Sequence, residues 1–300
     1  MMRLLHAWLA LSRIPFHTVG VLPFALGFVI ALHEGAVPAW GVFACGVGTV
    51  VLIMLATYTS GEYWDYREDA ISRPNLFSGG SKVVQRGLLP RKAPLAASLV
   101  CAALAFALVL ILRFAYGTGV WTIPLGVLGL VGGLFYSARP LRWVSRGVGE
   151  LLIAFFYGWM PIATAAYLQL GTVPELAHRV ALPIGLTIFD VILINEFPDY
   201  DADRRTGKRN LLVRIGPDRG AILYAAAAVL AWISVPLVVA GGAPRSAFLL
   251  YIPVWLVSAA LTAAVLTGWW RDWKRLQLLS GGTIVVNLGT TSVFLAALLL

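Results

Sequence analysis

The chain contains one acidic motif twice, with the form E-[YF]-x-D-Y-x-x-D. Residues 62–69 read E-Y-W-D-Y-R-E-D, and residues 196–203 read E-F-P-D-Y-D-A-D. Positions i, i+3 and i+7 of an α-helix lie within an arc of about 60°, so the three acids of each motif are expected on one face. These acids are Glu62, Asp65 and Asp69 in the first motif and Glu196, Asp199 and Asp203 in the second. Carboxylates crowded beside a bilayer repel each other unless a cation lies among them, so the motifs predict a site for a divalent metal ion.

The composition is that of a membrane protein. Of the 300 residues, 59% are hydrophobic and only 12% are charged, whereas a soluble domain has about 25% charged residues. Nine apolar runs have close to the ~20 residues that a transmembrane helix requires. They are residues 14–32, 40–59, 93–112, 114–138, 151–174, 180–197, 220–244, 246–270 and 276–300. We therefore expect an all-α, polytopic integral membrane protein with nine transmembrane helices in a single domain, residues 1–300, in which residues 1–13 form an amphipathic helix on the membrane surface.

The positive charges predict the orientation of these helices. Of 23 Lys and Arg residues, only Arg113, Arg179 and Arg245 fall in the connections after the third, fifth and seventh runs. The positive-inside rule then places the N-terminus and the other connections, with both acidic motifs, on the cytoplasmic side of the plasma membrane. The net charge of +9 follows from this bias and does not call for a nucleic acid partner. A basic face suits the lipid bilayer and anionic substrates.

Small and basic residues follow each acidic motif. Residues 78–82 read S-G-G-S-K, and Gly207 precedes two cations in the second connection. Small residues let the backbone approach a ligand closely, and neighbouring cations supply charge, which together favour phosphate binding. A flexible loop that only satisfies the positive-inside rule is the alternative. The candidate phosphate-binding cations are Arg73, Lys82, Arg86, Lys208 and Arg209.

Three further polar residues lie in or beside the apolar runs. Asn195 is about 40° from Asp199 around a straight helix, so we expect it at the site. Asp190 is about 180° from Asp199 and points away, which favours a buried structural hydrogen bond over a catalytic role. Glu150 begins an apolar run, where an acid interacts favourably with the helix dipole, so a structural role is at least as plausible as a catalytic one.

Two acidic motifs with basic neighbours are typical of a site that binds a diphosphate through Mg²⁺. Mg²⁺ prefers oxygen ligands and commonly takes one or two carboxylates together with substrate phosphates. Because the rest of the protein lies in lipid, we expect the diphosphate to carry a long apolar tail. Ionisation of an allylic diphosphate leaves a carbocation that aromatic faces can stabilise.

The chain resembles the UbiA superfamily of membrane prenyltransferases over nearly its whole length. The family pattern is N-D-x-x-D-x-x-x-D after the second helix and D-x-x-x-D after the sixth, which this chain matches with Asp65 and Asp69 and with Asp199 and Asp203. Where the family has Asn-Asp at the head of the first pattern, this chain has Gly61-Glu62. Similarity to the 1,4-dihydroxy-2-naphthoate polyprenyltransferase branch of menaquinone synthesis comes from residues 135–141, 147–150, 195–203, 207–211 and 213–216.

The resemblance implies a UbiA-type bundle and Mg²⁺-dependent transfer of a polyprenyl group from polyprenyl diphosphate to an aromatic acceptor, 1,4-dihydroxy-2-naphthoate or a related quinone precursor. The implied catalytic residues are Asp65, Asp69, Asp199 and Asp203. Glu62 and Glu196 would join these four in metal binding. The implied substrate-binding residues are Arg73, Lys82, Arg86, Lys208, Arg209, Asn195 and Tyr136.

Other functions remain open at this point. A UbiA-type terpene cyclase would use the same metal apparatus without a second substrate, and a prenyltransferase could use another acceptor such as 4-hydroxybenzoate. A transporter is disfavoured, because its acids belong in mid-span at broken helices, whereas both motifs here lie at the expected cytoplasmic ends of their runs.

Overall fold

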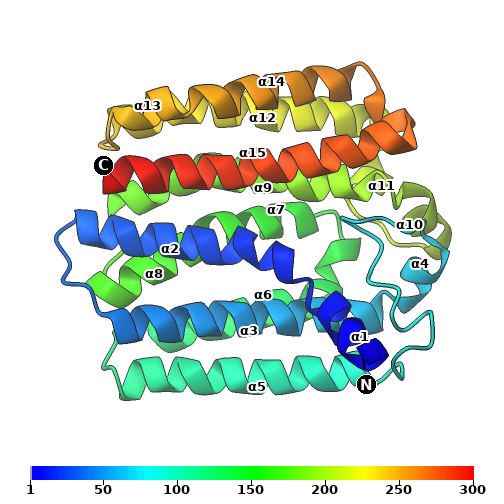
Figure 1. Cartoon of the computed structure of the whole chain (residues 1–300), viewed down its shortest axis with the longest axis horizontal. Helices are drawn as coiled ribbons and strands as arrows, with labels where there is room; N and C mark the ends of the chain where they lie inside the picture. The colour runs from blue at the N-terminus through cyan, green and yellow to red at the C-terminus, as the bar shows by residue number, and fades with distance from the viewer. Residues whose placement is uncertain (1) are drawn as a thin grey trace.

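All regular elements of the structure are helical. The computed structural model describes residues 2–300, with side chains from residue 4 onward, and the helical content of this range confirms the expected all-α class. An apolar segment within lipid has no water to hydrogen-bond its backbone, so it pairs its own N–H and C=O groups as a helix. The long helices lie side by side in a bundle, and the short helices of residues 66–71, 200–206 and 211–215 lie at the end that holds the N-terminus (Figure 1).

The long elements account for the apolar runs of the sequence. They are α2 (Thr18–His33), α3 (Trp40–Trp64), α5 (Ala93–Phe114), α6 (Thr122–Ser137), α8 (Met160–Leu170), α9 (Glu175–Glu196), α12 (Pro217–Ala240), α14 (Ile252–Leu266) and α15 (Trp273–Leu299). The short elements are α1 (Met2–Ser12), η1 (Ile14–His17), α4 (Tyr66–Ile71), η2 (Trp143–Ser145), α7 (Gly149–Ile153), the π-helical η3 (Ala154–Trp159), α10 (Tyr200–Thr206), α11 (Leu211–Ile215), α13 (Ser246–Leu250) and η4 (Trp269–Arg271).

Seven helical stretches within the described residues are long and apolar enough to cross a membrane. They are Leu4–His33, Trp40–Trp64, Ala93–Phe114, Gly149–Leu170, Glu175–Glu196, Pro217–Ala240 and Trp273–Leu299. The two remaining runs of the sequence, 114–138 and 246–270, contain the shorter helices α6, of 16 residues, and α14, of 15 residues. α6 is short because residues 115–121 form a connection, with Gly117 at a left-handed φ of 66°. The count of nine spans therefore stays a prediction.

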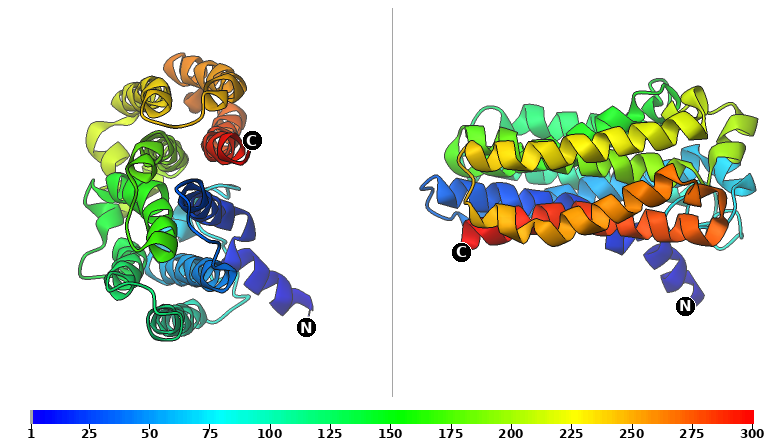
Figure 2. Two further views of the ribbon diagram at one scale, coloured as in Figure 1. Left: turned by 90° about the vertical axis from the view of Figure 1, so that its left-hand side faces the viewer. Right: turned by 90° about the horizontal axis from the view of Figure 1, so that it is seen from above.

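The N-terminal helix α1 diverges from the bundle (Figure 2). Leu4, Leu5 and Leu9 are exposed, whereas Ala7 and Leu11 are buried and pack with Val83 and Leu89 of the connection after α4. This two-faced pattern agrees with the expected surface helix, and its anchoring role stays a prediction.

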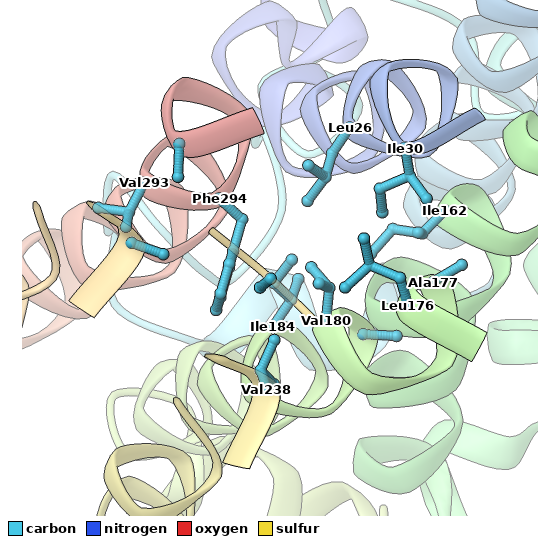
Figure 3. Packing of buried hydrophobic residues seen from close by; sticks show 14 of the residues in the cluster. Leu26, Ile30, Ile162, Leu176, Ala177, Val180, Ile184, Val238, Val293 and Phe294 are labelled. Carbon is cyan, nitrogen blue, oxygen red and sulfur yellow. The ribbon is translucent and has the colours of Figure 1, made fainter. Parts of the chain in front are cut away.

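The largest buried cluster joins α2, α8, α9, α12 and α15. Ile30, Ile162, Val180, Ile184 and Phe294 are among its members, and their side chains point toward one another across these helices (Figure 3). In lipid the apolar medium provides little driving force for helix association, so such close packing and small residues hold helices together. The cluster fixes α9, which carries the second acidic motif at its end, against the N-terminal half of the chain.

The crossing of α2 and α8 generates a test of this packing. A Cβ atom on Gly27 would overlap the main-chain oxygen of Ile162, and a backbone atom cannot move aside cheaply. We expect Gly27→Ala to lower the free energy of unfolding by about 1–3 kcal/mol. The matched control is Gly48→Ala, because its Cβ would meet only the Leu108 Cδ1 methyl, at 3.2 Å. Thermal unfolding in detergent compares the two, and a midpoint for Gly27→Ala at or above that of Gly48→Ala would contradict the packing.

Candidate active site

Both acidic motifs lie where a long helix ends, at the end of the bundle that holds the N-terminus, α4 and α10 (Figure 1). The first motif begins in α3, breaks at Asp65 and continues in α4. The second begins in α9 and continues in α10, after residues 197–199. The single straight helix expected for each motif, with its three acids on one face, is therefore interrupted in both motifs. Because α10 packs against α4, the breaks bring the second half of each motif against the other motif.

A cavity of about 240 Å³ lies between the two motifs. Its wall includes all six acids that the sequence singled out, which are Glu62, Asp65, Asp69, Glu196, Asp199 and Asp203. Three of the predicted substrate-binding residues, Tyr136, Asn195 and Lys208, also line it. The structure thus brings together side chains from two halves of the chain.

The cavity is rich in negative charge. Seven carboxylates line it, the six above and Glu68, and among the described residues only two cations, Arg13 and Lys208, share the wall. Burial, together with Asp65 and Glu62, raises the pKa of Asp69 well above its ordinary value. Burial also raises the pKa of Asp203 to about 6, although Lys208 opposes the shift.

The same surplus of negative charge suits a divalent cation. Burial raises the pKa of Asp199, and its Oδ1 atom lies buried with no hydrogen-bond partner among the described residues. No group of three His, Cys, Asp or Glu side chains within residues 2–300 is close enough to hold an ion by itself. Mg²⁺ does not require such a cage, since it commonly binds one or two carboxylates and completes its shell with water and substrate phosphates. The carboxylates present therefore fit the expected Mg²⁺.

Asp65 is held from outside its own motif. Its Oδ2 accepts a hydrogen bond of 2.6 Å from Ser137 Oγ at the end of α6, and its Oδ1 lies 3.5 Å from Arg142 Nη2. The same Arg142 atom lies 2.5 Å from Glu68 Oε1. Burial alone would lower the pKa of Arg142. The charges of Glu68 and Asp65 and their hydrogen bonds to the guanidinium favour its charged form, so the pKa is raised. The sequence reasoning missed Ser137, Glu68 and Arg142 as parts of the site, since the basic residues after α6 are equally explained by membrane orientation.

Glu62 is also held in place. Its Oε1 accepts a hydrogen bond of 2.6 Å from Ser81 N, and its Oε2 accepts one of 2.9 Å from Ser81 Oγ. Arg13, which follows α1 with a left-handed φ of 46°, places Nη2 at 3.6 Å from Glu62 Oε1. Arg13 was not singled out in the sequence. The signal available was a single cation just before the first apolar run.

The predicted phosphate-binding cations differ in position. Lys208 lies 3.3 Å from Asp203 Oδ2, and nearby carboxylates raise its pKa although burial would lower it. Lys82 is buried and hydrogen-bonds to Ser72, with Nζ 2.6 Å from Ser72 Oγ, and burial lowers its pKa. Lys82 is not part of the cavity wall, and neither are the other three predicted cations, which are exposed: Arg73, which covers the Trp273 ring at 4.6 Å, Arg86 and Arg209. Their role in binding stays a prediction.

A second, apolar cavity of about 100 Å³ lies deeper in the bundle, next to the first. The two cavities share Thr57, Tyr136, Ile153 and Tyr157 in their walls. Four glycines of α6 lie along the apolar cavity, at positions 126, 129, 132 and 133, and leave room where side chains would stand. The acidic site therefore adjoins an apolar space between α2, α3, α5, α6 and α8.

Asp190 lies outside this arrangement. It is buried in α9 and does not line either cavity, in agreement with the expectation that it points away from the acids. Its Oδ1 atom has no hydrogen-bond partner among the described residues. The expected structural hydrogen bond therefore stays a prediction.

Comparison with known proteins identifies the architecture. The model of the UbiA prenyltransferase family matches residues 21–291. The 1,4-dihydroxy-2-naphthoate octaprenyltransferase of Bacillus subtilis is 24% identical over 238 residues, which cover 79% of this chain and 75% of that protein. The digeranylgeranylglyceryl phosphate synthase of Pyrococcus horikoshii is 26% identical over 246 residues, covering 80% of this chain and 78% of that protein.

The fold has solved counterparts. A UbiA homologue from Archaeoglobus fulgidus, bound to GPP and Mg²⁺, aligns with a TM-score of 0.70 at 16% identity, covering 98% of this chain and 100% of that chain. Together with two facing acidic motifs at one end of an all-helical bundle, the match over residues 21–291 shows that this chain is a prenyltransferase of the UbiA family.

Proposed function

We propose that the chain catalyses Mg²⁺-dependent transfer of a polyprenyl group from polyprenyl diphosphate to an aromatic acceptor, 1,4-dihydroxy-2-naphthoate or a related quinone precursor. The observation that carries this proposal is that the acidic cavity and the apolar cavity lie next to each other and share four wall residues. A molecule with a charged head and an apolar tail matches both spaces at once. The UbiA homologue from Archaeoglobus fulgidus bound to GPP and Mg²⁺ supports this choice of substrate class.

The diphosphate would lie between the two motifs. Lys208 and Arg13 are the cations of the cavity wall, so we assign them to the phosphate oxygens. Asn195 lies on the same wall and can donate from its amide. The exposed Arg73, Arg86 and Arg209 would act at longer range by attracting an anionic head to this end of the bundle.

Asp65, Asp69, Asp199 and Asp203 would hold Mg²⁺, with Glu62 and Glu196 assisting. When bound, Mg²⁺ supplies positive charge that stabilises the diphosphate as a leaving group. Ser137 and Arg142 keep Asp65 directed into the cavity, and Ser81 and Arg13 do the same for Glu62.

Three tyrosines mark the passage from the acidic to the apolar space. Tyr136 and Tyr157 line both cavities, and Tyr58 lines the acidic one. When the bond from the prenyl C1 to the diphosphate oxygen breaks, the electron pair leaves with the diphosphate and the C1 allyl group becomes cationic. Aromatic faces at this position can stabilise that cation and exclude water. An electron-rich ring carbon of the acceptor then forms the new C–C bond at C1, and the ring recovers its aromaticity when that carbon loses its hydrogen as a proton or its carboxyl group as CO₂.

The acceptor is proposed from the relatives. The name of the Bacillus subtilis relative specifies 1,4-dihydroxy-2-naphthoate. The Pyrococcus horikoshii relative is named for a glyceryl phosphate product at similar identity and coverage. Fold and overall similarity are therefore shared by enzymes with different acceptors, and the acceptor has to be tested directly.

We also propose that the site faces the cytoplasm from the plasma membrane. The predicted cytoplasmic connections, which hold most of the Lys and Arg residues, gather at the end of the bundle that carries both motifs (Figure 1). The positive-inside rule places that end in the cytoplasm.

Removal of a metal-binding aspartate should abolish turnover. We expect Asp65→Ala and Asp199→Ala to lose far more than tenfold in rate, which corresponds to more than about 1.4 kcal/mol of barrier, while the variants still insert in the membrane. The matched control is Asp201→Ala, since Asp201 is an exposed acid of the second motif and should leave the rate nearly unchanged. Activity of either variant within about tenfold of wild type would overturn the metal assignment.

The assay for these variants also identifies the reaction. Purified protein in lipid is incubated with Mg²⁺ and geranylgeranyl or longer diphosphate, with and without a mixture of aromatic acceptors and a glyceryl phosphate, and products are identified by mass spectrometry. We expect a prenylated aromatic acceptor that disappears when Mg²⁺ is chelated. A cyclised hydrocarbon formed without acceptor would instead establish a terpene cyclase, and a prenylated glyceryl phosphate would replace the aromatic acceptor.

Adjacent cations should differ in their effect on diphosphate binding. We expect Lys208→Ala to weaken the affinity for geranylgeranyl diphosphate by at least about tenfold, roughly 1.4 kcal/mol, because Lys208 lies in the cavity wall. Arg209→Ala removes the same charge from an exposed position outside the wall and should change the affinity by less than about twofold. Calorimetric titration measures both, and equal losses would contradict the assignment.

Mg²⁺ binding should strengthen as pH rises through about 6. Protonation of Asp203, whose pKa is raised from 3.8 to about 6, competes with a cation for the same oxygens. The raised pKa stabilises the metal-free fold below about pH 4, and that contribution is lost as pH rises through about 6. As pH rises from about 4 to about 6, the temperature of the unfolding midpoint without metal should therefore fall. Over the same range, the amount by which Mg²⁺ raises that midpoint should grow. An increase caused by Mg²⁺ that is the same at about pH 5.5 and 7.5 would contradict a carboxylate site.

A further inference from the structure

Lys208 reaches the cavity from a segment that has little regular structure of its own. This segment joins α10 to α11, and Gly207 turns the chain there with a left-handed φ of 78°. Asn210 is fully buried, donates from Nδ2 to Asp203 Oδ2 at 2.9 Å, and accepts from Val213 N at 2.8 Å as the cap of α11. Lys208 N also donates to Asp203 O at 2.9 Å, so the position of Lys208 depends on α10 on one side and on what holds the start of α11 on the other.

Two carboxyl groups from other helices hold consecutive amides of α11. Glu150 Oε1, on α7, accepts from Leu211 N at 2.8 Å, and Glu196 Oε2, at the end of α9, accepts from Leu212 N at 3.3 Å. The first N–H groups of a helix have no partner within that helix, so these carboxyl groups supply the missing acceptors. α11 is thereby fastened to both α7 and α9.

Glu150 accepts this hydrogen bond from Leu211 N although its own side chain does not reach the cavity. Its exposed fraction is 0%, and it is absent from the walls of both cavities. It interacts with the Glu196 carboxyl group, and its Oε2 atom has no hydrogen-bond partner among the described residues. A substrate in the cavity could not touch Glu150, so any effect on binding has to pass through the main chain that Glu150 holds.

A second contact ties the same two segments together. The side chain of Arg214, on α11, packs against Gly147 just before α7, and its Nε donates to Arg209 O at 2.8 Å. Arg209 N in turn donates to Ser145 Oγ at 3.0 Å. The stretch that precedes α7 and the stretch that carries Lys208 are therefore packed as one unit, with Glu150 as its buried attachment point.

We propose that Glu150 is a positioning residue for the diphosphate: by accepting from Leu211 N it fixes α11 and so holds Lys208 in the cavity. This inference rests on the proposed binding of a prenyl diphosphate. It differs from a role at the helix dipole of α7, because a dipole interaction requires the negative charge, whereas the attachment of Leu211 requires only an acceptor oxygen.

A double-mutant cycle between Glu150 and Lys208 tests the inference on the full chain in detergent. Glu150→Met fills a similar volume without an acceptor, and Glu150→Gln keeps the acceptor and can donate to Glu196. With Mg²⁺ and geranylgeranyl diphosphate, we expect Glu150→Met to weaken affinity by roughly tenfold and Glu150→Gln by less than about twofold. Adding Glu150→Met to Lys208→Ala should weaken affinity by less than about twofold further, since the cation to be positioned is already gone.

Thr290→Val is the matched control for simple loss of stability. It removes a buried hydrogen bond of 2.9 Å between Thr290 Oγ1 and Tyr251 OH, which is not part of the segment that joins α10 to α11. This variant should lower the unfolding midpoint without changing the affinity for geranylgeranyl diphosphate. Hydrogen exchange at residues 207–215 should quicken in Glu150→Met and not in Thr290→Val, and this readout holds even where affinity cannot be measured for a variant.

The outcomes separate this inference from the proposed function. Unchanged affinity in Glu150→Met, equal losses in Glu150→Gln and Glu150→Met, or losses that multiply in the double variant would each overturn the positioning role while wild type still binds. Failure of wild type to bind geranylgeranyl diphosphate would overturn the proposed function itself, and the inference with it.

Discussion

Repulsion among buried carboxylates is the constraint on which this end of the molecule depends. Seven carboxylates line one cavity, and a few nearby cations supply only a partial counter-charge. Arg142 pairs with Asp65 and Glu68, and Lys208 pairs with Asp203. Among the described side chains no cation lies within ion-pair distance of Asp69 or Asp199, and burial raises the pKa of each. An arrangement this costly persists where a ligand compensates for it, which a divalent ion with a diphosphate would do.

The carboxylates stay close together only if the helices that carry them are packed rigidly against one another. In lipid, interhelical hydrogen bonds and close contacts between small residues fix helices to one another. α9 is fastened to α15 through Thr187 and Asn287, at 3.0 Å, and Tyr224 of α12 bonds to Thr283 of α15 at 2.8 Å. These bonds, with the apolar cluster of Figure 3, fix the helix whose last residue is Glu196. The helices of the N-terminal half enclose the apolar cavity, because the glycines of α6 have no side chains to fill it.

Much of this could be predicted from the sequence, because the strongest signals are local. Uncharged runs predict helices in lipid, and the repeated motif predicts two acidic helix ends. The break at Asp65 was not predictable in the same way, because residues 62–71 contain neither Gly nor Pro, and the contacts that Asp65 makes there are with Ser137 and Arg142, 72 and 77 residues away. Glu150 is a similar case. Its partner, Leu211 N, is 61 residues away and is a main-chain group with no signature in the sequence.

The basic residues show most clearly where sequence reasoning stops. Orientation in the membrane and binding of an anion both call for Lys and Arg on the same connections, so composition cannot separate the two roles. Position in the cavity wall separates them. Lys208 and Arg13 line the cavity, leave only 14% and 25% of their side chains exposed and lie against carboxylates, whereas Arg209 beside Lys208 is exposed to solvent. A cation that is withdrawn from water and surrounded by acids has lost hydration that an orienting charge would keep. We therefore assign diphosphate binding to the cations of the cavity wall and not to the basic connections as a whole.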